Sequence, residues 1–86
     1  MWEVEFTDQS IQELHKLDRT VAQRILRKLR WLSENYSSIE PERLSGQLAN
    51  LFKLRVGDYR LLYTTSNEER KLIVHMVGHR SEIYKR

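Results

Sequence analysis

The sequence predicts an α+β fold, in which an N-terminal strand and a two-helix hairpin precede an antiparallel three-strand meander. Apolar residues alternate with polar ones at residues 2–6, follow a helical spacing from residue 11 to residue 32, and alternate again from residue 48 onward. Helices that lie between a first strand and later hairpins pack together on one face of a twisted sheet. At 86 residues, the chain is expected to form one domain over residues 1–86.

The first elements are a short strand and a short helix. Trp2, Val4 and Phe6 alternate with two glutamates, which is the period of a strand with one exposed face. Thr7 or Asp8 can then cap a helix. Its apolar stripe consists of Ile11, Leu14 and Leu17.

A second, longer helix is expected to begin after Asp18, which can cap it, and to end near residues 35–38, ahead of Pro41. Its inner face is apolar and consists of Val21, Ala22, Ile25, Leu26, Leu29 and Leu32. Its outer face is basic and consists of Arg24, Arg27, Lys28 and Arg30. We interpret these basic residues as a solvated helix face in preference to an RNA-binding surface.

The remainder of the chain predicts three strands joined by tight turns. The first contains Phe52, Leu54 and Val56, which alternate with Lys53 and Arg55. A tight turn at residues 57–58 leads to a strand over residues 59–64, and a polar turn at residues 66–69 leads to a last strand over residues 72–77.

This hairpin can bring three cations together on one face of the sheet. Lys53 and Arg55 point away from the apolar side of their strand, and Arg60 does the same after the turn. The three are therefore expected on the face that the helices leave uncovered. Like charges placed opposite each other on a sheet repel, so the arrangement is easier to understand if an anion normally lies among them.

Composition limits the remaining choices. The net charge is +3, and it is concentrated in residues 50–86, which have a balance of +4 against −1 for residues 1–49. Such a basic half indicates either a surface for a polyanion or a solvated face. The chain has no cysteine, so disulfides and thiolate metal sites are excluded. We expect a cytoplasmic protein, because no export signal and no membrane-spanning apolar run is present.

Two motifs resemble those of the RelE/ParE toxin superfamily. One strand of that family reads K-L-R-x-G-x-Y-R-x-x-Y, and its chain end reads G-H-R-x-x-x-Y. The matching segments here are Leu51-Phe52-Lys53-Leu54-Arg55-Val56-Gly57-Asp58-Tyr59-Arg60-Leu61-Leu62-Tyr63 and Val77-Gly78-His79-Arg80-Ser81-Glu82-Ile83-Tyr84. The chain length and the order of the expected elements match as well, so the resemblance covers nearly the whole chain.

The resemblance implies a toxin of a type II toxin–antitoxin system with a microbial RNase-like fold. RelE-like members cut messenger RNA in the ribosomal decoding site, by attack of the ribose 2′-hydroxyl on the adjacent phosphate. They use lysines and arginines in place of a histidine/glutamate pair, with no metal and no cofactor. The implied partners are the ribosome, messenger RNA and a cognate antitoxin in a hetero-oligomeric complex, and no membrane.

The same resemblance assigns roles to individual residues. Arg80 would lie beside the scissile phosphate, and Arg60 would stabilise the transition state. Lys53 would act as base or as charge stabiliser, and Tyr84 would stack on a base or orient the nucleophile. Arg55, His79 and Lys85 would contact the RNA. His15 and His75 are interpreted as structural.

One departure from the family leaves alternatives open. RelE-type sequences often have a second lysine two residues before the position of Lys53, and here that residue is Leu51. Arg55, His79 or another group must then replace it, or cleavage is slower. The alternatives are a ParE-like inhibitor of DNA gyrase without nuclease activity, a degenerate member that only binds antitoxin, and a general basic RNA-binding module.

Overall fold

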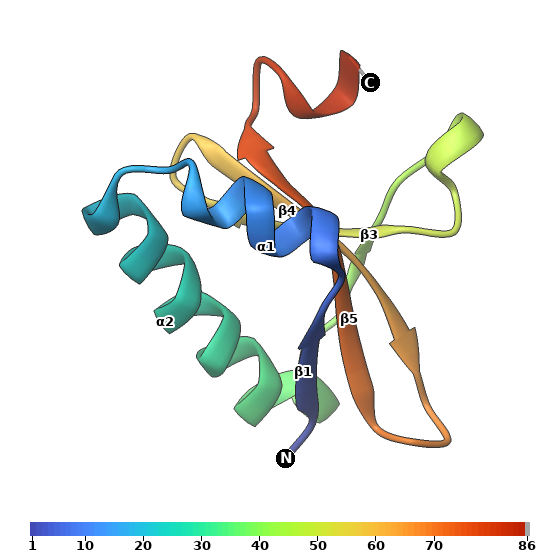
Figure 1. Ribbon diagram of the computed structural model, residues 1–86. Helices are drawn as coiled ribbons and strands as arrows, with labels where there is room; N and C mark the ends of the chain where they lie inside the picture. The colour runs from blue at the N-terminus through green and yellow to red at the C-terminus, as the bar shows by residue number, and fades with distance from the viewer. Residues whose placement is uncertain (86) are drawn as a thin grey trace.

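A computed structural model describes residues 1–85 and shows a mixed sheet with two helices on one of its faces (Figure 1). The strands are β1 (Glu3–Phe6), β2 (Glu42–Arg43), β3 (Phe52–Val56), β4 (Tyr59–Ser66) and β5 (Lys71–His79). They lie in the order β1-β5-β4-β3-β2, with β1 parallel to β5 and the other pairs antiparallel. The predicted α+β class and the three-strand meander are therefore confirmed.

The helices α1 (Asp8–His15) and α2 (Arg19–Asn35) begin after side-chain caps. Thr7 Oγ1 accepts a hydrogen bond from the Ser10 N–H at 3.2 Å, and Asp18 Oδ2 accepts one from the Thr20 N–H at 3.1 Å. Each cap satisfies a backbone donor that the first helical turn would otherwise leave unpaired. Three short 3₁₀ turns complete the described elements: η1 (Tyr36–Ser38), η2 (Gly46–Leu48) and η3 (Ile83–Lys85).

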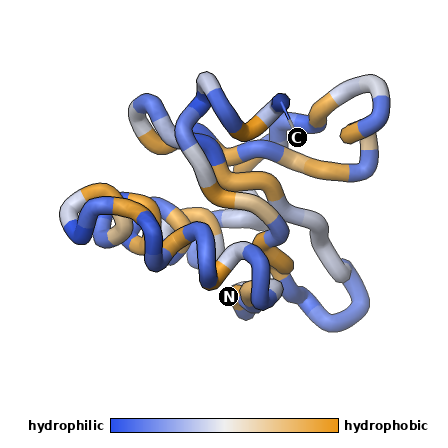
Figure 2. The backbone as a smooth tube through the Cα atoms, turned by 45° about the horizontal axis from the view of Figure 1, so that its top comes forward, coloured by the Kyte–Doolittle hydropathy of each residue, from blue (hydrophilic) through white to orange (hydrophobic). Residues whose placement is uncertain are grey.

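The main core fills the space between the two helices and the sheet. The middle strands are mostly apolar, whereas the turns around them are hydrophilic (Figure 2). Because apolar side chains on α2 and on one face of the strands remove each other from water, this contact provides most of the hydrophobic stabilisation. The buried members are Ile25, Leu29, Leu32, Tyr36, Leu54, Leu61, Tyr63, Leu72, Val74 and Val77.

The opposite face of the sheet carries a second, smaller core that the sequence did not predict. Leu62 and Ile83 are almost fully buried there, and Leu51 is 8% exposed. Leu44, Leu48 and Met76 pack around them. The expectation that this face is uncovered is thus wrong in part. The segment around η3 folds back over the apolar residues of β4 and β5, because those residues would otherwise face water.

The structure also differs from the sequence-based prediction in having β2, a two-residue strand at the edge of the sheet. Its register pairs Glu42 with Lys53 and Arg43 with Phe52. A strand this short has no measurable alternation, so its sequence contains no signal that distinguishes it from a loop. It matters because it places a carboxylate beside the predicted cations.

The paired hydroxyls of Tyr36 and Tyr63 predict a loss of stability at alkaline pH. Burial raises the pKa of both side chains, whose hydroxyl oxygens lie 3.5 Å apart. Above about pH 10 the unfolded chain therefore releases these protons before the folded one does, and the free energy of unfolding falls as the pH rises. Urea denaturation over this range checks the expectation. Tyr63→Phe should give a shallower pH dependence, and equal slopes for the two proteins would contradict it.

Candidate RNA-binding site on the open sheet face

Two of the predicted cations lie side by side on the face of the sheet opposite the helices. Arg55 of β3 and Arg60 of β4 are direct partners in the register, and Lys53 is two residues before Arg55 on the same face. Side chains at such paired positions have Cβ atoms about 4.5–5.5 Å apart. The convergence that the strand alternation predicted is therefore present.

The sequence suggested that an anion lies among these cations, and in the structure this anion is the carboxylate of Glu42. The Glu42 carboxylate accepts from Lys53 Nζ at 3.1 Å and from Arg55 Nη2 at 3.0 Å. The hydrogen bond from Lys53, helped by the charge of Arg55, lowers the pKa of Glu42. The sequence reading did not identify Glu42 as a site residue. The signal that could have found it is its position next to Pro41, in a short exposed segment that a sheet edge can recruit.

Arg60 and Arg80 lie at the turn that joins β3 to β4. Arg60 Nη1 donates to the carbonyl oxygens of Gly57 and Tyr59, both at 2.8 Å, so its guanidinium curls back onto the turn. The Arg80 N–H donates to the Asp58 carbonyl at 2.8 Å, and its Nε lies 3.7 Å from the Asp58 carboxylate. Arg80 is exposed. Arg55, Arg60 and Arg80 therefore surround one turn, and we call this group the arginine cluster.

His79 does not join the arginine cluster. It pairs with Tyr59 in the register, whereas Arg60 pairs with Gly78, and neighbouring residues of a strand point to opposite faces. Its ring meets the Tyr59 ring edge-on at 5.3 Å between centroids, and its Nδ1 accepts from the Ser81 N–H at 3.1 Å. His79 is thus held by neighbours on the helix side of the sheet. His15 is exposed on α1, and His75 Nε2 lies 2.8 Å from Thr64 Oγ1, which agrees with structural roles for both.

Tyr84 and Lys85 are exposed on η3, which lies on the open face of the sheet. Their segment is anchored by Ile83, which packs against Leu62, the register partner of Lys53. The Tyr84 side chain is 40% exposed, so its ring is available to stack on a base.

Leu51 packs in the second core, on the opposite side of the sheet from the helices. A lysine at this position would have to bring its charged group out of that core. We expect Leu51→Lys to lower the free energy of unfolding by about 2–3 kcal/mol, because the apolar contacts are lost and the ammonium must still reach water. Urea denaturation measures the change, with Leu51→Met as a control of similar volume that should cost less than about 1.5 kcal/mol. An unchanged midpoint for Leu51→Lys would show that this core is loosely packed.

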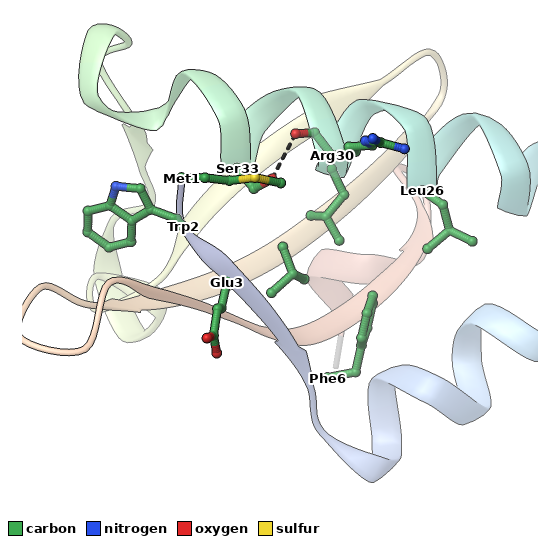
Figure 3. Close-up of a pocket in the computed structure, with 9 residues that line it drawn as sticks. Met1, Trp2, Glu3, Phe6, Leu26, Arg30 and Ser33 are labelled. Carbon is green, nitrogen blue, oxygen red and sulfur yellow. Dashed lines mark hydrogen bonds between the residues drawn. The ribbon is translucent and has the colours of Figure 1, made fainter.

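Other features of residues 1–85 lie apart from the arginine cluster. An apolar groove of about 650 Å³ is lined by residues of β1 and α2, with Trp2 and Phe6 on one side and Leu26 on the other (Figure 3). No cluster of His, Asp and Glu within residues 1–85 could hold a metal ion, and no helix there is long and apolar enough to cross a membrane.

Comparison with known proteins identifies the family. The family described as "ParE toxin of type II toxin-antitoxin system, parDE" matches residues 4–84. This chain belongs to the RelE/ParE toxin superfamily. The resemblance found in the two sequence motifs is therefore confirmed.

The relatives of this toxin include proteins named for RelE. It is 37% identical over 87 residues to toxin RelG of Mycobacterium tuberculosis, covering 96% of this chain and 95% of that protein. It resembles a chain of the RelBE2 toxin–antitoxin complex of M. tuberculosis, with a TM-score of 0.81, 30% identity and coverage of 92% and 98%. It also resembles the isolated E. coli RelE toxin, with a TM-score of 0.77, 30% identity and coverage of 98% and 92%.

Proposed function

We propose that this toxin is a ribosome-dependent endoribonuclease that cuts messenger RNA in the decoding site and so inhibits translation and growth. The observation that carries the proposal is the arginine cluster at the β3–β4 turn, where Arg55 and Arg60 are register partners on the open face and Arg80 pairs with Asp58 of the turn. Arginine binds phosphate through two parallel hydrogen bonds, which suits a phosphodiester. The likeness to toxins of the RelE type supports the same function.

The geometry suggests a role for each of these residues in the cleavage reaction. Attack of the 2′-hydroxyl on the adjacent phosphorus forms one P–O bond and breaks the bond to the 5′-oxygen. The 2′-hydroxyl gives its proton to a base of the protein, and the 5′-oxygen takes up a proton from solvent water. Arg60 and Arg80 stabilise the charge that develops on the phosphate oxygens. Lys53, held by the Glu42 carboxylate, supplies further positive charge. Tyr84 stacks on a base, Arg55 and Lys85 contact the RNA backbone, and no metal ion is required.

Glu42 is suited to accept the proton of the 2′-hydroxyl. A glutamate carboxylate is ionised at neutral pH, as a proton acceptor must be, although the lowered pKa of Glu42 makes it a weaker base than an unpaired glutamate. The carboxylate also lies between two residues expected to contact the RNA, Lys53 and Arg55. We therefore assign the role of general base to Glu42 and not to Lys53. His79, on the helix side of the sheet, contributes to binding at most.

We further propose a cognate antitoxin as partner, in a hetero-oligomeric complex in the cytoplasm. The solved relatives include the RelBE2 complex of M. tuberculosis and the RelBE complex of E. coli, in which toxin and antitoxin are bound to each other. An antitoxin that covers or displaces the exposed η3 segment would silence the site.

Controlled expression with primer extension on cellular messages tests the proposal. We expect growth arrest, cuts within codons, and no cuts when translation is blocked. Because the matching family is named for ParE toxins, inhibition of DNA gyrase is the second candidate. Growth arrest with intact messages and inhibited supercoiling would support that candidate and contradict the nuclease. Harmless expression would exclude both.

A further inference from the structure

A second group of basic side chains lies on α2, on the helix side of the β3–β4 turn. It surrounds a hollow of about 480 Å³, which is within the range of roughly 300–1,000 Å³ typical of ligand sites. We call it the α2 groove. It is lined by Arg24, Arg27, Lys28, Trp31, Arg55 and Gly57. The sequence alone suggested a solvated helix face for the first three of these residues.

Within residues 1–85, three of the four cations that line the α2 groove have no carboxylate partner; the fourth, Arg55, pairs with Glu42. No acidic residue lines the groove, and no carboxylate within residues 1–85 pairs with Arg24, Arg27 or Lys28. Arg30 on the same helix differs, because it pairs with Glu34. Like charges three and four positions apart on a helix repel. The groove therefore keeps an unfavourable concentration of positive charge, which a bound polyanion would relieve.

An exposed aromatic ring lies within this basic group. The Trp31 side chain is 43% exposed, and Lys28 Nζ lies 4.1 Å from the centre of its ring. A large aromatic ring among cations is the combination that binds single-stranded nucleic acid, where bases stack on the ring while the cations hold the backbone. An acidic protein segment would use the cations but leave the ring without a role.

The α2 groove is continuous with the arginine cluster through the β3–β4 turn. Gly57 has a φ of +59°, and a Cβ atom there would lie 2.9 Å from Nη2 of Arg24. The guanidinium of Arg24 therefore lies over the turn, and on the same turn the Gly57 carbonyl accepts from Arg60. Arg55 belongs to both groups, because it lines the groove and is the register partner of Arg60.

The geometry points to a path for the single-stranded messenger RNA, which passes from the arginine cluster over the β3–β4 turn into the α2 groove. There Arg24 and Arg27 bind phosphates and Trp31 stacks on an unpaired base. This inference rests on the proposed nuclease function, and it adds a binding region that the two sequence motifs do not contain.

The test measures binding of the toxin to a labelled single-stranded RNA of about twelve nucleotides, a length within known site sizes of about 4–16 nucleotides. Methylated 2′-hydroxyls prevent cleavage, and fluorescence anisotropy is recorded over a salt series. The double variant Arg24→Gln with Arg27→Gln should bind on the order of tenfold more weakly. Its dependence of log K on log salt should be shallower by about 1.4, because two phosphate contacts to a single strand are lost. Arg19→Gln with Arg30→Gln, a matched exposed pair on the same helix, should change binding little.

Trp31 provides a second readout. Trp31→Ala should weaken binding by about 5- to 150-fold, the effect of losing one stacked base. Quenching of tryptophan fluorescence by the RNA should disappear in Trp31→Phe. Equal thermal midpoints for all variants will show that these exposed positions leave the fold intact. A polyglutamate peptide that binds as tightly as the RNA, with no effect of Trp31→Ala, would overturn the inference in favour of an acidic protein.

These outcomes separate the inference from the proposed function. If the toxin cuts messages in cells but the groove variants bind RNA as well as the matched control does, the α2 groove is not part of the RNA path. If the groove variants alone lose binding while the native toxin cuts no message, the groove stands as an RNA-binding surface and the nuclease proposal fails.

Discussion

Replacement of Arg80 by alanine is expected to reduce messenger RNA cleavage by about 10²–10³-fold while the protein stays folded. The magnitude is that of removing one donor that stabilises charge in a transition state. Arg80 can be removed at little cost to stability, because its ion pair with Asp58 is long, at 3.7 Å, and both side chains are largely exposed. Exposed pairs of this kind contribute about 0–1 kcal/mol.

The measurement is single-turnover cleavage of a message bound to programmed ribosomes, together with urea denaturation. Arg80→Lys keeps the charge but loses the paired donors of the guanidinium, so we expect it to restore only a small part of the rate. Arg30→Ala removes an exposed arginine from α2 and serves as the control. A cleavage rate for Arg80→Ala within a few-fold of the native rate would remove Arg80 from the reaction.

The placement of Arg55 and Arg60 on one face of the sheet was predictable because it depends on local rules. Alternation decides which side of a strand faces the helices, and a tight turn fixes the register of the strands it joins. From these rules alone Arg55 and Arg60 had to lie on the same face, and they are direct partners. Caps and helical spacing likewise located both helices, with Thr7 and Asp18 as the caps.

The parts that sequence did not predict depend on contacts between distant segments. Ile83 is one apolar residue in a polar chain end, and only the folded sheet shows that it covers Leu62. Glu42 looks like one of several surface glutamates until β2 pairs it with Lys53. Leu51 matched a family position that often carries lysine, but its environment is set by η3, more than thirty positions away. Patterns of neighbouring residues along a sequence do not predict contacts of this kind between distant segments.

Replacement of Glu42 by glutamine is expected to slow cleavage by about 10²–10⁴-fold, the usual contribution of a positioned general base. Glutamine has nearly the same shape but cannot take up the proton of the 2′-hydroxyl at neutral pH. RNA binding should stay equal or become tighter, because Lys53 and Arg55 no longer share a negative charge. The expected signature is therefore a fall in the single-turnover rate without a loss of affinity.

The opposite result has an equally definite meaning. If Glu42 only neutralises its two cations, Glu42→Gln will bind RNA more tightly and cut it as fast as the native toxin or faster. Glu40→Gln, two residues earlier and also exposed, is the control for loss of one negative charge nearby. A carboxylate titration by NMR completes the experiment, because the lowered pKa of Glu42 places its midpoint below the usual glutamate value of about 4.3. Lys53→Met should move that midpoint upward, since the hydrogen bond from Lys53 is the largest cause of the lowering. The effects of Glu42→Gln on rate and affinity together thus distinguish a carboxylate that acts as general base from one that only neutralises its two cations.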